Sequence, residues 1–381
     1  MPFRRFCRTA MGSLALLTVT ATATASPDWP QITGLVQFDG AMHAEDELSF
    51  RNDLDVRRAD LRLNGEIDRQ WAWRAEYDLA REDSGLRRLW LAHRLAMGEL
   101  RLGQLRVPTG LERQMEPEHR PFLEVSATTD LFTEGDRLGV GYQLLTQHYG
   151  VQTALFSRNL GDDLVGDAPL GAAVRGYIAP FNWPGELFHA GLSLSYEDRR
   201  DEGVERGAWP DSRSTGEPLI AANVDDGDSV LKGGAELAVV SGPFSAGFEY
   251  FGARIGSDDE DDPLLSGFNT QLAYVLTGES RNYREGAFAG ISPRNRLGAW
   301  EVALRFSNVN LDDSDLRQGV QNTAALALNW YANEQVRVMF NAVYADVEES
   351  QVELDQAGED EAVLVDDESL GMALMRLQFR F

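Results

Sequence analysis

The chain ends on the seven residues MRLQFRF, positions 375–381, in which apolar and polar side chains alternate without a break. Met375, Leu377, Phe379 and Phe381 take one set of positions, and two arginines and a glutamine take the other. Residues two apart lie on one face of a β-strand, so this stretch predicts a final strand with an apolar face and a basic face. Such a strand suits a sheet over a soluble core, or a membrane barrel with one face in lipid and the other in a wet lumen.

The same alternation recurs along most of the chain. Between Trp71 and Leu79 the odd positions are apolar, and between Trp300 and Ser307 the even positions are apolar. This period of two indicates β-strands throughout. We expect sixteen strands, near residues 31–42, 52–66, 71–80, 86–96, 99–107, 137–145, 148–157, 170–180, 186–197, 230–240, 243–254, 267–278, 297–309, 320–331, 335–347 and 368–381.

The lengths of the connections distinguish a sheet over a soluble core from a membrane barrel. Each even-numbered strand leads to the next through a tight turn, such as 67–70 or 241–242, except for the longer connection 279–296. The other connections include long acidic segments and the stretch 108–136. Short turns at one end and long loops at the other are typical of outer-membrane barrels. We therefore predict an all-β, 16-stranded antiparallel transmembrane β-barrel whose last strand turns its arginines into the lumen.

The N-terminus resembles a secretory signal. Arg4 and Arg5 precede a short apolar core, and Ala23-Thr24-Ala25 forms a small-residue cleavage site. We expect residues 1–25 to be a signal peptide and residues 26–381 to form one barrel domain. The single cysteine, Cys7, lies in the signal, so the rest of the chain offers no disulfide and no thiolate metal site. We expect no cofactor.

The charge is strongly acidic and unevenly distributed. The 381 residues include 61 acidic and 35 basic ones, for a formal charge of −26, and Lys232 is the one lysine. Acidic residues concentrate in segments 198–229, 255–266 and 345–368, which we interpret as solvated loops.

Arginine is frequent on the polar faces of the predicted strands. Guanidinium groups stay charged and bind phosphate or carboxylate through a planar fork, so a ring of them favours anions in a pore. Alternatively, these arginines pair with inward-facing acids and brace the wall. By parity the inward-facing arginines include Arg58, Arg62, Arg74, Arg88, Arg94, Arg106, Arg305, Arg337, Arg376 and Arg380, and the acids include Asp60, Glu66, Glu76, Asp78, Glu249 and Glu301.

The stretch 108–136 is long enough to be functional, and we expect it to fold into the pore and narrow it. Motifs of enzymes are absent from the sequence: it has no H-E-x-x-H, no G-x-S-x-G and no Walker loop. We predict that the protein is not an enzyme. An outer-membrane hydrolase would need a serine–histidine pair brought together across strands.

Several motifs, in order along the chain, resemble the phosphate-selective porin O/P family of Gram-negative outer membranes. They are RRADLRL at 57–63, GQLRVPTGLE at 103–112, RLGV at 137–140, LTGESRNY at 276–283, GAWE at 298–301 and LNWY at 328–331. The resemblance implies a homotrimeric porin, in contact with lipid and lipopolysaccharide, that lets small anions diffuse passively, with phosphate and polyphosphate as candidates.

The resemblance also implies which residues bind the anion. The paired arginines of the second strand and the basic residue of the G-Q-x-[KR] motif correspond to Arg57, Arg58 and Arg106. Arg137 opens the motif that follows the long loop and joins the pore-lining candidates. Parity, however, points Arg57 away from the lumen. A general or cation-preferring porin stays open as an alternative because the chain is so acidic.

Overall fold

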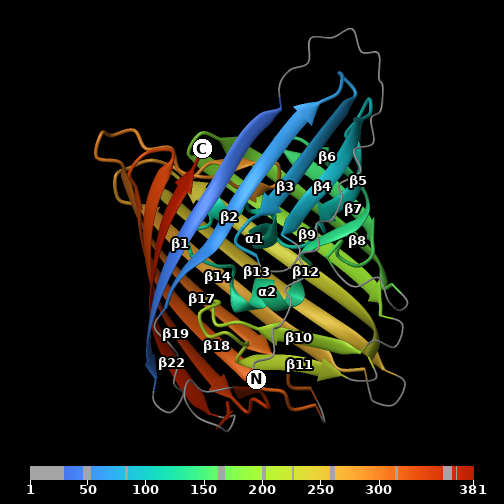
Figure 1. Ribbon diagram of the computed structural model, residues 1–381, viewed down its shortest axis with the longest axis vertical. Coiled ribbons are helices and arrows are strands. Elements are labelled where there is room, and N and C mark those ends of the chain that lie inside the picture. The colour runs from blue at the N-terminus through green and yellow to red at the C-terminus, as the bar shows by residue number, and fades with distance from the viewer. Residues whose placement is uncertain are drawn as a thin grey trace, which may run out of the picture.

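In a computed structural model of the protein, the chain forms a closed barrel of antiparallel strands (Figure 1). The structure describes residues 30–45, 53–81, 85–161, 168–199, 203–224, 227–257, 262–313, 316–354, 363–365 and 367–381. The predicted signal peptide and the acidic run 258–261 lie outside these residues.

All sixteen predicted strands are confirmed, with ends that differ by a few residues. In order around the barrel they are β1 (Gln31–Glu45), β2 (Asp53–Glu66), β3 (Trp71–Asp78), β4 (Leu86–Arg94), β5 (Glu99–Arg106), β6 (Asp136–Leu145), β7 (Tyr149–Phe156), β8 (Leu170–Trp183), β9 (Glu186–Asp198), β12 (Gly227–Ser241), β13 (Phe244–Ser257), β14 (Leu264–Val275), β17 (Ala299–Asn310), β18 (Val320–Tyr331), β19 (Val336–Glu348) and β22 (Glu368–Arg380).

The last residue of the chain takes part in closing the barrel. β22 pairs with both β19 and β1. Beyond the strand, the Phe381 amide donates to the Gly34 carbonyl at 3.1 Å, and the Gly34 amide donates to the Phe381 carbonyl at 2.9 Å. A Cβ on residue 34 would lie 2.3 Å from the Phe381 ring, so the ring needs glycine there. The alternation of MRLQFRF therefore extends to the end because the closing seam extends to the end.

The two faces of the barrel differ as the alternation predicts. Leu377 and Phe379 are 41% and 43% exposed on the outer face, whereas Arg376 and Gln378 are 1% and 3% exposed. The inward polar side chains are buried because chain segments that enter the barrel cover them. No helix among the described residues is long and apolar enough to cross a membrane.

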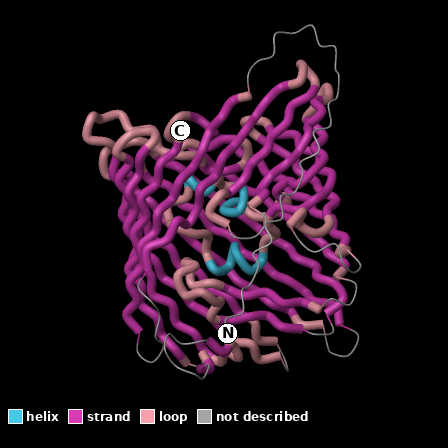
Figure 2. Tube along the Cα trace, in the orientation of Figure 1, coloured by secondary structure: helices cyan, strands magenta, loops and turns pink. Residues whose placement is uncertain are grey.

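The segment 107–135, between β5 and β6, lies against the inner wall. It contains α1 (Leu111–Gln114), the 3-10 turn η1 (Pro117–His119) and α2 (Ala127–Phe132), drawn in cyan within the barrel outline in Figure 2. Ser126 caps α2 by accepting a hydrogen bond from the Thr129 amide. On β13, the Glu249 carboxylate accepts from the amides of Leu111 and Glu112, at 2.6 and 3.1 Å. The segment thus stays inside because barrel side chains satisfy its backbone.

The prediction of a solvated loop at 198–229 is wrong for the described residues in its middle. β10 (Val204–Ala208) pairs with β11 (Ile220–Val224), and β10 packs against α2. Ala208 and Ile220 are fully buried in a cluster that includes Phe132 and Phe251. The apolar residues of this hairpin outweigh the acidic composition around it, because they cover the apolar side of α2.

The connection 276–298 also forms a hairpin, of β15 (Tyr283–Arg284) and β16 (Ala287–Phe288). Phe288 and Ile291 are each 4% exposed, and Arg281 donates to the His119 carbonyl at 2.8 Å. This connection therefore meets segment 107–135 inside the barrel. A third hairpin, of β20 (Glu353–Leu354) and β21 (Val363–Leu364), occurs in the connection that joins β19 to β22 along the chain.

Candidate functional site

A cavity of about 510 Å³ lies between segment 107–135 and the β2–β6 wall. Its lining is unusually basic for a protein this acidic. We call it the arginine pocket, defined by Arg57, Arg58, Arg81, Arg87, Arg106, Arg113, Arg120, Arg137 and Arg213. The acidic residues in its lining are Glu124, Asp130 and Asp136. The wall and segment 107–135 contribute arginines, and Arg213 comes from the connection between β9 and β12, so the pocket forms only when the loops are in place.

Two β-bulges add arginines to the pocket. The pairing of β1 with β2 steps from Gln37–Arg58 to Phe38–Val56, which leaves Arg57 as an extra residue. A bulge interrupts the alternation of faces. Arg57 therefore lines the pocket beside Arg58 and donates to Glu124 at 2.8 Å, so the prediction from parity that it points outward is wrong.

The second bulge has the same form. The pairing of β3 with β4 steps from Glu76–Arg88 to Tyr77–Leu86, and the residue left over is Arg87. Arg87 lines the pocket, whereas Arg88 binds the carboxylates of Glu76 and Glu116. At both bulges two arginines are adjacent in the sequence. Two adjacent charged residues interrupt the alternation of a strand, and this interruption was the sequence signal for Arg87.

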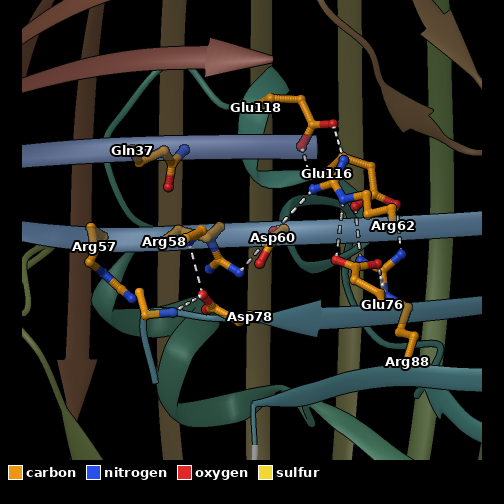
Figure 3. Close-up of polar contacts among 12 residues, drawn as sticks. Gln37, Arg57, Arg58, Asp60, Arg62, Glu76, Asp78, Arg88, Glu116 and Glu118 are labelled. Atoms are coloured by element: carbon orange, nitrogen blue, oxygen red, sulfur yellow. Dashed lines mark hydrogen bonds and ion pairs between the residues drawn. The ribbon is translucent and has the colours of Figure 1, made fainter. Parts of the chain in front are cut away.

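Glutamates of segment 107–135 hold the arginines next to the pocket. Arg88 makes two parallel hydrogen bonds of 2.8 Å to Glu116, which also accepts from Arg106 at 3.3 Å. Arg62 binds Glu118 at 2.5 and 3.1 Å. Figure 3 shows Arg62 between the carboxylates of Glu118 and Glu76. These pairs fix the segment to the wall through bidentate contacts, the stronger kind of ion pair.

The electrostatics of the segment favour ionised glutamates. Burial by itself would raise the pKa of Glu116, but Arg88 and Arg106 hold that pKa well below its ordinary range. Burial likewise opposes ionisation of Glu124, and Arg57 and Arg376 hold its pKa well below the ordinary value. The segment is therefore attached by full charges at neutral pH.

Two arginines of the pocket differ from the others because, among the described residues, each has a buried Nε–H group without a hydrogen-bond acceptor. Arg58 is 5% exposed, and its ion-pair partner is Asp60 at 3.6 Å. Arg120 is 6% exposed and donates to the Met115 carbonyl at 3.4 Å. Among the described residues, neither Nε has a hydrogen-bond acceptor and no carboxylate lies within 4 Å of Arg120. Burial and the neighbouring Arg113 lower the pKa of Arg120 to about 9, which leaves it cationic at neutral pH.

The other predicted pore-lining arginines differ in their surroundings. Arg106 and Arg137 line the arginine pocket, and Arg74 binds Glu76 at 2.7 Å next to Arg62. Arg305 has no exposed side-chain area and binds Glu112 at 2.9 Å and Asp211 at 2.7 Å. The side chain of Arg337 is 3% exposed, and it donates to the Arg120 carbonyl at 2.7 Å. Arg305 and Arg337 thus lie under the segment they hold, outside the pocket lining.

Sequence reasoning missed five arginines of the pocket. Arg81 lies in the connection after β3, Arg87 lies at the bulge of β4, and Arg113, Arg120 and Arg213 come from segments without periodicity. Alternation predicts the direction of a side chain only within a regular strand. For the three loop arginines no signal in the sequence was available.

The chemistry of the described residues gives little support to other kinds of site. No group of histidine, cysteine or acidic residues among them is arranged to hold a metal ion. A serine–histidine contact does occur, since Ser214 Oγ lies 2.9 Å from His43 Nε2 and 2.8 Å from Ser212 Oγ.

Comparison with known proteins is consistent with this geometry. The family model described as phosphate-selective porin O and P matches residues 31–381. Porin O of Pseudomonas aeruginosa is 28% identical over 326 residues, which cover 74% of each chain. The anion-selective porin from Comamonas acidovorans has a TM-score of 0.56 at 13% identity, covering 92% of this chain and 99% of that one. The trimer form of OmpT from Vibrio cholerae has a TM-score of 0.58 at 12% identity, covering 93% and 100%.

Proposed function

We propose that this chain, which belongs to the phosphate-selective porin O and P family, is a passive outer-membrane channel that prefers small anions. The observation that carries the proposal is the arginine pocket, where nine arginines and three acidic residues line a cavity of about 510 Å³. Each of those acids is within 4.0 Å of an arginine. The lining residues therefore carry an excess of positive charge.

The acidic charge of the whole chain does not oppose this preference. Much of it belongs to the long acidic connections and not to the pocket lining, and at 0.15 M salt the Debye length is about 8 Å. Charges at that distance from the solute are largely screened. Arginines that line a narrow, partly dehydrated passage act on the solute at contact range and are screened much less.

Phosphate fits the free donors of the pocket. A guanidinium offers parallel N–H groups that match two oxygens of a phosphate. Arg58 and Arg120 have unused donors in a buried setting, and an anion bound there would satisfy them. We therefore assign the strongest solute contacts to Arg58 and Arg120, with Arg57, Arg87, Arg106 and Arg137 completing the positive lining.

The test of this assignment is block of chloride current by phosphate in planar bilayers. Phosphate should reduce the chloride current of the wild type, and Arg58→Ala and Arg120→Ala should each weaken that block about tenfold, the cost of losing a charged hydrogen bond. Arg94→Gln is the matched control, since Arg94 binds Glu66 at 2.6 Å at an exposed position outside the pocket. Equal block in all four proteins would refute the assignment.

The proposal includes a homotrimer surrounded by lipid and lipopolysaccharide. Its support is the family and the fold shared with a porin solved in a trimer form. Cross-linking of intact outer membranes should give a species of three chains that unheated detergent preserves. A monomer under both conditions would contradict this part of the proposal.

An enzyme is the second candidate, and one contact favours it. Ser214 and His43 lie 2.9 Å apart at the edge of a cavity of about 240 Å³ that Ser214 helps to line. A hydrolytic serine is activated by a base at this distance. Covalent labelling of Ser214 by a fluorophosphonate, abolished in His43→Ala, would support the enzyme; absence of labelling supports the channel alone.

A further inference from the structure

The hairpin β15–β16 ends in a strained turn. Its two central residues, Glu285 and Gly286, both have positive φ, of 54° and 81°. Such turns favour Asn-Gly, because a longer side chain at the first position is unfavourable in the left-handed region. A glutamate therefore occupies a position where its backbone conformation is a disadvantage. Strain of this kind is retained where the side chain has a function.

The barrel wall fixes this turn in place. Arg175 on β8 donates to the Gly286 carbonyl at 2.6 Å, and Tyr283 OH lies 2.6 Å from Nδ1 of His189 on β9. A Cβ on residue 286 would lie 2.4 Å from the Tyr177 ring, so the turn packs closely against β8. The tip cannot move away from the wall without losing these contacts, and the Glu285 side chain has a fixed origin.

The carboxylate of Glu285 faces the short-turn mouth of the barrel. Its side chain is 60% exposed, and Arg284 lies 3.7 Å away. It helps to line a cavity of about 460 Å³ next to the turns after β6 and β8. Glu285 also interacts electrostatically with Arg101 on β5. Glu99 also pairs with Arg101, at 2.7 Å, so Glu285 and Glu99 together balance the charges of Arg284 and Arg101 at this mouth.

The position of Arg101 links this mouth to the arginine pocket. Arg101 and Arg106 lie on the same strand and share a cavity of about 30 Å³. Along β5, Arg101 lies between Arg106 of the pocket and the short turn that precedes the strand, so an anion that leaves the pocket toward the short turns passes Arg101 and then Glu285. A channel conducts well when its solute can enter a binding site and also leave it.

From this geometry we propose that Glu285 determines on which side of the channel anions are captured. Its carboxylate neutralises the arginines at the short-turn mouth, so this mouth does not attract anions; entry and binding occur from the long-loop side, and a released anion does not rebind. This proposal rests on the anion preference proposed above.

The experiment measures the on-rate of phosphate block of the chloride current, with phosphate added to one side at a time. The sequence has one cysteine, at position 7, so Leu297→Cys, which is 82% exposed on the short-turn side, can carry an impermeant biotin that reports channel orientation. Glu285→Gln should raise the on-rate from the short-turn side roughly fivefold, the effect of one charge at a few ångströms in water. The on-rate from the long-loop side should stay unchanged.

Two further variants make the result specific. Glu285→Asn also removes the charge, and asparagine suits positive φ, so it replaces Glu285→Gln if that variant folds poorly. Glu334→Gln removes an exposed acid from another short turn and should behave as wild type. Equal rates in wild type and both Glu285 variants would overturn the inference, as would an equal rise in Glu334→Gln. A wild type that phosphate does not block would instead overturn the proposed function, and this inference with it.

Discussion

Replacing Arg305 by methionine should release segment 107–135 from the wall opposite the arginine pocket. Arg305 binds two buried carboxylates, Glu112 at 2.9 Å and Asp211 at 2.7 Å. Burial opposes the charge of Glu112, and Arg305 with the Ser126 hydrogen bonds holds its pKa below the ordinary value. Removing one partner of a buried ion pair costs about 3–5 kcal/mol, because the remaining charge is left in a poorly solvated site. We expect the free energy of unfolding to fall by an amount in that range, to which both carboxylates contribute.

Two measurements report this loss of stability. The temperature at which the folded band disappears on SDS gels should fall, and single-channel currents should become larger and noisier as the segment moves. The triple variant Arg305→Met, Glu112→Gln, Asp211→Asn should recover much of the thermal loss, because the buried charges are gone. Arg94→Gln should change stability by about 1 kcal/mol or less, as for other exposed pairs. Wild-type stability and current in Arg305→Met would refute the claim that this pair holds the segment.

Three other outcomes can be checked with the same gels and recordings. Gly34→Leu should prevent closure of the barrel by displacing the Phe381 ring, whereas Gly233→Ala, with open space around it, should fold normally; a heat-modifiable band in Gly34→Leu would contradict this. Phe379→Asp puts a charge on the lipid face and should lower the amount of protein in the outer membrane, measured by surface biotinylation; wild-type amounts would contradict it. Because the pKa of Glu116 is depressed, its attachment to Arg88 contributes fully above the ordinary glutamate pKa and is lost only at lower pH, so channel noise should stay constant from pH 7 to pH 5; a rise in noise over that range would show that the pairs are weaker than the geometry indicates.

Most of the barrel could be predicted from the sequence because every strand follows the same local rule. A strand with one face in lipid must alternate, and Trp71–Asp78 or Ala299–Asn310 can be recognised without knowing their neighbours. The same rule gave the inward direction of Arg62 and Arg376. It failed at Arg57 because the extra residue of a bulge depends on pairing with β1, which a single strand does not reveal.

The interior of the barrel could not be predicted in this way. Arg120 and Arg213 reach the pocket through loops whose positions depend on distant contacts, such as Glu249 with the amides of α1. The buried hairpin β10–β11 lay in a segment whose acidic composition favoured solvent. Composition reports the average of a segment, whereas burial depends on which few apolar residues meet a partner surface.

The most direct measurement of the central claim is the reversal potential in a KCl gradient across a bilayer. We expect the wild type to prefer chloride over potassium, and we expect Arg58→Ala and Arg120→Ala each to reduce this preference while Arg94→Gln leaves it unchanged. A wild type that prefers potassium, with the same reversal potential in Arg58→Ala and Arg120→Ala, would contradict it and would show that the arginines brace the wall without selecting the solute.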